Sequence, residues 1–214
     1  MAPPVLFGAT YSVYTRICRL ALEEKGVPYR LEEVDVFAPD GPPPDYLRRQ
    51  PFGKIPAFEH DGFALYESGA ISRYVDEAFD GPPLQPQDPQ PRARMNQTIS
   101  ILDSYAYRAW VWGLFVERVR KPLRGATPDE TAIAAALPKA RAACDTLADI
   151  LAGQPFLCGA RISLADLHAA PMLACLTMTP EGQAMIGEKS VLAQWWVRLR
   201  LRPAMAATRG ITEV

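Results

Sequence analysis

Proline is concentrated in one short stretch of this 214-residue chain, and that stretch limits how the chain can fold. Five of the ten residues from 82 to 91 are proline. Because proline fixes φ and lacks a backbone N–H, this stretch favours an extended connector over a helix or a central strand. We predict a linker at residues 82–91, which joins one domain of residues 1–81 to another of residues 92–214. A second cluster, residues 39–44, is predicted to be a surface loop because apolar and turn patterns continue beyond it.

The residues before the linker alternate between strand and helix patterns. Apolar residues at helical spacing follow a short apolar run, and a second such run then completes a β-α-β unit with a parallel strand pair. Asp61 and Gly62 favour a tight hairpin turn between two further strands. The expected elements are strands at residues 5–7, 29–36, 55–59 and 63–66 and helices at residues 14–25 and 68–79. The first domain is therefore predicted to be α/β, with a four-stranded sheet.

Every segment after the linker has helical periodicity, so the second domain is predicted to be all-α. Apolar residues recur every three or four positions over residues 92–121, and Pro122 should end this helix. Residues 127–130, Thr-Pro-Asp-Glu, form a predicted capping box with proline at the first helical position. The helix that it starts should run to Leu151, and Pro138 should kink or split it.

Two further helices are expected towards the carboxyl terminus. Ser163 and Asp166 have the spacing of a helix-start box, and residues 195–201 belong to a last helix. The basic stretch of residues 198–209 is interpreted as a solvated helix face rather than a nucleic-acid site.

Composition excludes several classes of partner. The chain has 23 Lys+Arg against 24 Asp+Glu, so no net field attracts nucleic acid or an anionic membrane. The longest apolar stretch, residues 167–180, is interrupted by His168 and Pro171 and is shorter than the roughly 18 residues that a membrane span needs. The first residues do not resemble a secretory signal, and we predict a cytoplasmic location.

Cysteine and histidine are too sparse for several kinds of chemistry. The four cysteines contain no C-x-x-C pair, and His60 and His168 are the two histidines. We therefore expect reduced, buried thiols and no metal. The chain also lacks a G-x-S-x-G elbow, a P-loop and a G-x-G-x-x-G sequence, which argues against serine hydrolases, P-loop enzymes and Rossmann dehydrogenases. The cysteines are Cys18, Cys144, Cys158 and Cys175.

Three motifs in fixed order carry a resemblance to a known family. They are residues 51–56 (PFGKIP), residues 66–71 (YESGAI) and residues 159–166, which hold the Ser163 and Asp166 pair. Their order and spacing resemble those of the soluble glutathione transferases, and this resemblance covers nearly the whole chain. Residues 8–16 resemble the phi class of plants and its bacterial relatives. The resemblance implies a thioredoxin-like α/β domain before an all-helical domain. It also implies a homodimeric enzyme that conjugates the thiolate of glutathione, its co-substrate, to a small hydrophobic electrophile.

The resemblance assigns a glutathione site to the first domain. Pro56 would be cis, so that the backbone of Ile55 faces the cysteinyl part of glutathione. Glu67 would take the ammonium group and Ser68 the carboxylate of the γ-glutamyl residue, at a helix amino terminus that favours anions. Lys54 would contact the backbone or carboxylates of the tripeptide. The alternatives are an edge-strand proline, two helix-start residues without a ligand, and a solvated lysine.

Catalysis in this family needs a donor that holds the glutathione sulfur as thiolate. The resemblance to the phi class indicates Ser12. Tyr11 and Tyr14 are competing donors, because other classes use a tyrosine hydroxyl. Ser12 is also a candidate cap of the first helix, a role compatible with catalysis, and Thr10 or Thr15 could cap it instead.

The chain departs from the phi pattern at the glycyl carboxylate. Residues 39–44 contain no histidine or lysine for this contact, and Gly69 replaces an arginine. Either Arg49 or Lys54 would have to replace the contact, and the sequence does not choose between them.

An electrophile pocket is expected along the long helix of the second domain. Five aromatic residues fall within eleven positions there, and at 3.6 residues per turn they cannot all face one way, so some pack in the core. The predicted pocket residues are Tyr11, Tyr105, Trp110 and Phe115, whereas Tyr107 and Trp112 are the other two aromatics of the helix. The predicted dimer surface lies near Tyr74 and Tyr105.

The same scaffold has two alternative functions. One is a non-catalytic module that binds glutathione or another ligand. The presence of Ser12, Glu67 and Ser68 is evidence against it. The other is a glutathione-dependent isomerase, reductase or peroxidase. Residues 10–12, Thr-Tyr-Ser, contain neither the serine-rich run of isomerases nor the cysteine of reductases.

Overall fold

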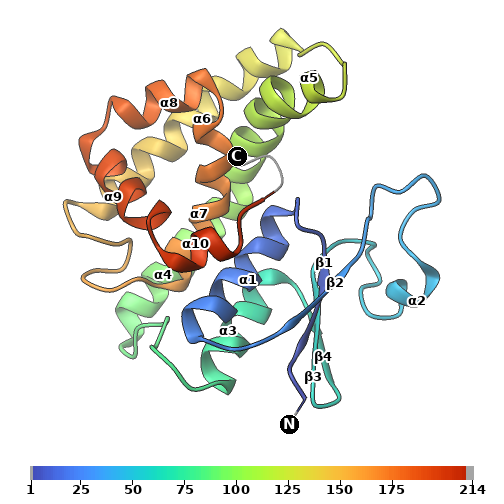
Figure 1. Ribbon diagram of the computed structural model, residues 1–214. Coiled ribbons are helices and arrows are strands. Elements are labelled where there is room, and N and C mark those ends of the chain that lie inside the picture. Colours follow the sequence, from blue (N-terminus) through green and yellow to red (C-terminus); the bar gives the residue numbers. More distant parts are fainter. Residues whose placement is uncertain (1, 211–214) are drawn as a thin grey trace. The chain divides into compact units, whose positions relative to one another are not determined.

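The computed structural model describes residues 2–210 and divides into two compact units (Figure 1). The first unit contains the residues up to Gln85 together with the described residues from Arg202 onward, and the second contains Pro86–Leu201. The division after Gln85 falls inside the predicted linker. The prediction that all later residues belong to the helical domain needs correction, because the short helix α10 (Pro203–Ala207) packs on the first unit.

The first unit is built on a four-stranded mixed sheet in the order β2-β1-β3-β4. Strands β1 and β2 are parallel, whereas β3 is antiparallel to both β1 and β4. Asp61 and Gly62 both have positive φ, 46° and 82°, as the hairpin prediction requires. Strand β2 is shorter than predicted and β3 begins only after Pro56. The strands are β1 (Val5–Gly8), β2 (Arg30–Glu33), β3 (Ala57–His60) and β4 (Phe63–Tyr66).

Helices cover both faces of this sheet. Figure 1 shows α1 (Val13–Lys25) and α3 (Ser68–Ala78) on one side and α2 (Pro44–Leu47) on the other. Leu6 and Phe58 are fully buried in the core of this unit. On the α2 side, Tyr46 packs with Val34 and Ala57 in a smaller cluster. The fold is therefore the predicted α/β arrangement, with α2 in the loop region between β2 and β3.

The second unit consists of helices, and the long helix predicted at residues 92–121 is a succession of α-helical and π-helical segments. The path continues from α4 through two π-helical segments, in which the wider i→i+5 bonding replaces the α-helical pattern. The helices are α4 (Pro89–Ile101), η1 (Leu102–Ala106), η2 (Arg108–Arg120), α5 (Lys121–Leu123), α6 (Glu130–Leu151), α7 (Leu164–Thr177), α8 (Pro180–Gly187) and α9 (Ser190–Arg200). The prediction of an all-helical domain is confirmed, although α8 was not predicted.

The start of α6 corrects a local prediction. Asp129, not Thr127, is the N-cap, and its carboxylate accepts hydrogen bonds from the backbone N–H groups of Thr131 and Ala132. The helix also runs unbroken through Pro138. Helix α6 packs closely against η2 here, because a Cβ built on Gly113 of η2 would lie 2.4 Å from the Cβ of Ala136 in α6.

Candidate active site

Ser12 occupies the N-cap of α1. Its hydroxyl oxygen accepts a hydrogen bond from the backbone N–H of Thr15 at 3.2 Å, and its carbonyl accepts one from Arg16 at 2.9 Å. Its φ and ψ, −85° and 124°, are those of an N-cap residue. Because the oxygen accepts within the helix, the hydroxyl hydrogen remains available for donation to a ligand. The predicted capping role of Ser12 is therefore observed.

The hydroxyl of the neighbouring Tyr11 has another partner. The Tyr11 hydroxyl donates to Asp35 at 2.7 Å, and the same carboxylate oxygen accepts from the backbone N–H of Phe37 at 2.9 Å. The ring centroids of Tyr11 and Phe37 lie 5.9 Å apart. Thr15 is fully buried and does not cap the helix with its side chain. These contacts favour Ser12 over Tyr11 as the free donor at this end of α1.

The loop before β3 has the backbone geometry that the resemblance implied. The Ile55–Pro56 peptide bond is cis. The side chain of Gln50, which is 1% exposed, accepts hydrogen bonds from the backbone of Lys54 at 3.1 Å and of a second loop residue. The Tyr46 hydroxyl donates to the carbonyl of Lys54 at 2.5 Å, and burial raises the pKa of this tyrosine. Sequence reasoning missed both Tyr46 and Gln50, because neither belongs to a motif and their role depends on the folded loop.

The start of α3 exposes unpartnered backbone donors. Glu67 stands at the N-cap with φ of 73° and ψ of 114°, and its side chain makes no capping hydrogen bond. A positive φ at a residue other than glycine costs of order 1–3 kcal/mol and is frequent at functional sites. Ser68 is the first residue of the helix and is buried. The amide groups of this first turn, with the positive end of the helix dipole, suit a carboxylate ligand.

Sheet register brings these segments to one edge. Phe7, Ala57 and Tyr66 form a row across β1, β3 and β4. The end of β1, the start of β3 and the end of β4 therefore lie side by side. This edge gathers Ser12 after β1, Ile55 and Pro56 before β3, and Glu67 and Ser68 after β4.

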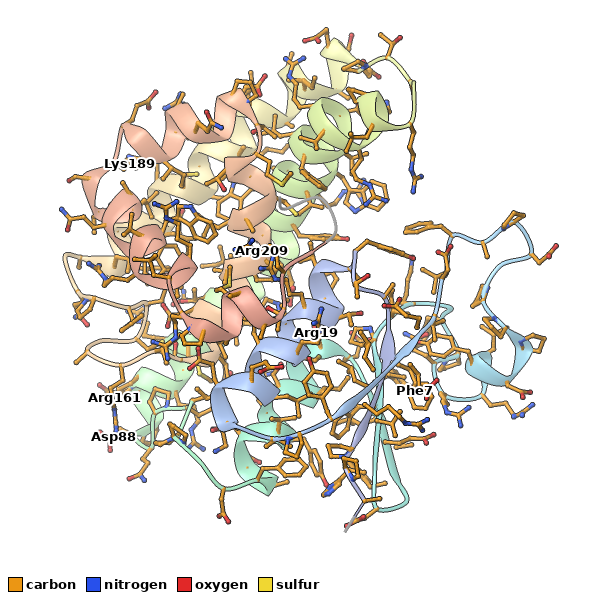
Figure 2. All side chains as sticks on the ribbon, in the orientation of Figure 1. Phe7, Arg19, Asp88, Arg161, Lys189 and Arg209 are labelled. Atoms are coloured by element: carbon orange, nitrogen blue, oxygen red, sulfur yellow. The ribbon has the colours of Figure 1, made fainter. Side chains whose placement is uncertain are left out.

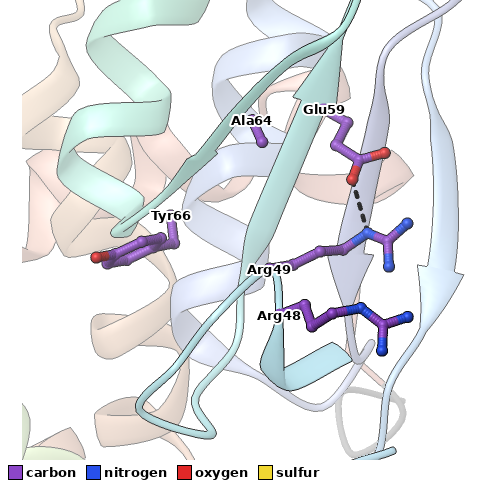
Figure 3. A pocket seen from close by; sticks show the side chains of 5 residues that line it. All are labelled: Arg48, Arg49, Glu59, Ala64 and Tyr66. Carbon is purple, nitrogen blue, oxygen red and sulfur yellow. Dashed lines mark hydrogen bonds and ion pairs between the residues drawn. The ribbon is translucent and has the colours of Figure 1, made fainter. Parts of the chain in front are cut away.

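The two candidates for the glycyl carboxylate differ in their contacts. Arg49 pairs with Glu59, with 2.7 Å between Nε and Oε1, and its guanidinium lies 4.6 Å from the ring centroid of Phe7. It lines a hollow of about 450 Å³ on the α2 face of the sheet, and Figure 3 shows the pair. Lys54 is exposed and makes no ion pair within residues 2–210. Of the two candidates, Lys54 is therefore the more accessible to a ligand. The hollow is lined by Arg48, Arg49, Glu59, Ala64 and Tyr66.

Two family models together match most of the chain. One is the N-terminal domain of glutathione S-transferase, over residues 6–83, and the other is the C-terminal domain, over residues 97–203. A probable glutathione S-transferase, GSTF2, from Oryza sativa is 31% identical over 204 residues, 95% of this chain and 94% of the relative. The chain belongs to the glutathione S-transferase family.

Its relatives and structural neighbours include plant enzymes of the phi class. Glutathione S-transferase 1 of Zea mays is 29% identical over 96% of this chain and 95% of the relative. The crystal structure of glutathione transferase F7 from Populus trichocarpa has a TM-score of 0.85 and 30% identity, covering 96% of this chain and 97% of the other. These likenesses confirm the recognised family, the phi-like resemblance, the two-domain fold and the transferase assignment.

The aromatic residues of the second unit only partly fit the pocket that we predicted for this transferase. Trp110 is fully buried and donates its indole N–H to the carbonyl of Ala140 in α6 at 3.0 Å, so it is a core residue and not a pocket residue. Phe115 is also buried, whereas 66% of Tyr105 is exposed. The π-helical path explains the error, because it changes which positions share a face. Residues at intervals of four are buried along it: Leu102, Ala106, Trp110 and Leu114.

Two features are absent from the described part of the transferase. None of its helices is long and apolar enough to cross a membrane. Among residues 2–210, no group of three or more His, Cys, Asp or Glu side chains is arranged to hold a metal ion.

Proposed function

We propose that this glutathione transferase conjugates the thiolate of glutathione to hydrophobic electrophiles, and that the Ser12 hydroxyl stabilises the thiolate. The observation that carries the proposal is the capping bond from Thr15, which fixes the serine oxygen at the amino end of α1 and leaves its hydrogen free to donate. A structural neighbour, glutathione S-transferase I from maize, was solved in complex with an atrazine glutathione conjugate. It is 27% identical, with a TM-score of 0.84, and covers 97% of this chain and 96% of its own.

Ser12 would act as a hydrogen-bond donor and not as a base. A serine acting as a base needs a partner such as histidine, and both histidines are engaged elsewhere. His60 Nδ1 lies 2.9 Å from the Tyr74 hydroxyl, and His168 Nε2 lies 2.8 Å from Asp103 in the second unit. A charge-assisted hydrogen bond and the positive end of α1 both favour the thiolate. Lowering the thiol pKa by one unit requires about 1.36 kcal/mol, which these two interactions can supply.

The same sheet edge would bind the rest of glutathione. The backbone of Ile55 would pair with the cysteinyl residue. Glu67 would hold the γ-glutamyl ammonium, while Ser68 and the first turn of α3 would hold the γ-glutamyl carboxylate. Lys54 would contact the glycyl carboxylate, since Arg49 is already paired with Glu59.

The electrophile and the assembly belong to the same proposal. Tyr11, Tyr105 and Phe115 are the residues that we propose to contact the apolar electrophile. A cytoplasmic homodimer would be the working form, with a contact surface near Tyr74 and Tyr105. A transferase-fold module that binds glutathione without catalysis is the competing function.

The decisive comparison is between wild type, Ser12→Ala, Tyr11→Phe and Tyr14→Phe. Ser12→Ala should lower kcat/KM with a chlorodinitrobenzene substrate by roughly ten- to a thousand-fold, since one lost donor to a developing or bound anion has effects of this order. The ultraviolet thiolate absorbance of the glutathione complex should titrate at higher pH, while glutathione affinity changes little. The tyrosine variants should resemble wild type.

Three outcomes would count against the proposal. If a tyrosine variant shifts the titration and Ser12→Ala does not, Ser12 is not the donor. If wild type is retained on immobilised glutathione but has no turnover, the binding module is the better function. Failure of both retention and turnover would remove the glutathione function altogether.

A further inference from the structure

Arg16 connects the first turn of α1 to the carboxyl-terminal segment of the described chain. Its backbone N–H donates to the carbonyl of Ser12 at 2.9 Å, which closes the first turn of the helix. Its side chain extends towards residues 205–208, and Arg16 as a whole is only 4% exposed. The guanidinium donates from Nη2 to the Met205 carbonyl at 3.2 Å and from Nε to the Thr208 hydroxyl at 3.3 Å. One residue therefore joins the candidate thiolate donor to α10.

The end of α10 is suited to receive arginine side chains. The last carbonyl groups of a helix lack intrahelical partners and carry the negative end of the dipole, so cations stabilise them. Arg19 of α1, labelled in Figure 2, donates to the carbonyls of Ala207 at 3.1 Å and Thr208 at 3.4 Å. Thr208 is fully buried, and its hydroxyl donates to Ala204 at 2.8 Å. Residues 202–208, which we call the C-terminal clamp, are thus hydrogen-bonded to α1 through Arg16 and Arg19.

Strand β1 holds the opposite side of the same turn. A Cβ built on Gly8 would lie 2.3 Å from the hydroxyl oxygen of Thr15, so the strand and the helix approach as closely as glycine allows. Thr15 is also the residue whose N–H donates to Ser12. The first turn of α1 consequently has the strand on one side and the C-terminal clamp on the other. Neither contact touches the hydroxyl of Ser12 itself.

We propose that Arg16 is a positioning residue for the transferase reaction, and that the C-terminal clamp sets the direction in which Ser12 presents its hydroxyl to the glutathione sulfur. This inference rests on the proposed role of Ser12. It assigns to the far end of the sequence a part in catalysis, although the clamp contributes no group that touches glutathione. A donor displaced by about 1 Å can cost up to a hundredfold in rate, so the geometry of this turn is sufficient to control activity.

The test compares Arg16→Lys, Arg16→Gln and Thr208→Val with a matched control, Arg202→Gln. Arg202 belongs to the same clamp but forms an ion pair with Glu24, at the far end of α1 from Ser12. Thr208→Val changes no charged group, and Arg16→Lys keeps the positive charge. Measured quantities are kcat, KM for glutathione, the pH titration of the bound thiolate and the melting temperature.

The proposal expects a catalytic effect that the control does not share. Arg16→Lys and Thr208→Val should lower kcat by about tenfold and move the thiolate titration to higher pH by about one unit, with KM for glutathione within about twofold of wild type. Arg202→Gln should lose stability to a similar extent while its titration and kcat stay at the wild-type values. If Arg16→Lys and Thr208→Val melt earlier but titrate and turn over like wild type, the positioning role is wrong and Arg16 is a packing residue only.

A second measurement separates this inference from the proposed function. Hydrogen exchange of the Thr15 amide, without glutathione, reports directly on the bond to Ser12. Faster exchange in Thr208→Val than in Arg202→Gln would support the clamp, and equal exchange would overturn it. If wild type forms no thiolate with bound glutathione, the proposed function fails, and the exchange data still decide whether the clamp positions Ser12.

Discussion

Replacing Asp166 with alanine should be among the most destabilising single substitutions in the second unit. The carboxylate is fully buried and accepts four hydrogen bonds: from the backbone of Leu157 and of Ser163, each at 2.9 Å, from the Ser163 hydroxyl at 2.7 Å and from the Trp195 indole at 2.9 Å. Alanine leaves three buried N–H donors unpaired, each at a cost of about 1–3 kcal/mol. Removing the desolvated carboxylate offsets part of that loss, so we expect a net destabilisation of about 3–5 kcal/mol.

Thermal unfolding gives the cleanest measurement of this loss. For a chain of this length each kcal/mol lowers the melting temperature by about 2–4 °C, so Asp166→Ala should melt roughly 6–20 °C below wild type. Ser163→Ala, the matched control, removes one hydroxyl from the same box and should lose only about 1–2 kcal/mol. Glutathione affinity of the folded variant should stay within about twofold, since Asp166 belongs to the helical unit. A melting temperature within about 2 °C of wild type would refute the hydrogen-bond reasoning, and a large loss of affinity would show that Asp166 serves the binding site.

The pH dependence of the same site has a definite sign. Burial raises the pKa of Asp166 above its usual value, against the opposing effect of its hydrogen-bond donors. Between the two pKa values the folded protein binds more protons than the unfolded chain, so the stability contributed by this group falls as pH rises through that range. The difference in unfolding free energy between wild type and Asp166→Asn should therefore shrink with rising pH and become constant above the folded-state pKa. A difference that grows with pH would show that the donors, not burial, dominate.

Two further predictions concern the binding loop and the assembly. Tyr46→Phe removes the hydroxyl that donates to the Lys54 carbonyl. Glutathione binding, measured by calorimetric titration, should weaken by about two- to tenfold, and the protein should lose about 1 kcal/mol of stability. An unchanged affinity would show that Tyr46 does not support the binding loop. Light scattering at micromolar concentration should give about twice the 23.6 kDa of one chain, and a value near one chain would refute the homodimer.

Local sequence patterns predicted those parts of the fold that depend on neighbouring residues. The Asp61 and Gly62 turn formed as expected because both residues tolerate positive φ. Ser163 and Asp166 start α7 because a capping box needs only their spacing of three. The capping role of Ser12 is equally local. The same logic failed before α6, where Asp129 caps the helix and the predicted start at Thr127 does not form.

The resemblance named the candidate residues of a glutathione site, but no pattern predicted the contacts that hold the surrounding segments in place. Gln50 and Tyr46 shape the loop before Pro56 from positions that carry no motif. The partner of Tyr11, Asp35, lies 24 residues away along the chain. Trp110 was misplaced because helical periodicity assumes 3.6 residues per turn, whereas the chain there adopts the wider π-helical pattern.

The sequence by itself determined the two-part organisation, the α/β and all-helical classes, the hairpin and the caps at Ser12 and Ser163, because proline, glycine and short polar side chains act on the backbone within a few residues. Only the tertiary structure decided that the sheet edge gathers the ends of β1 and β4 with the start of β3, and that α10 returns to the first unit. Strand register and the burial of Arg16 against Thr208 depend on contacts between residues far apart in the chain. Such contacts form only when the whole unit packs, and no local pattern encodes them.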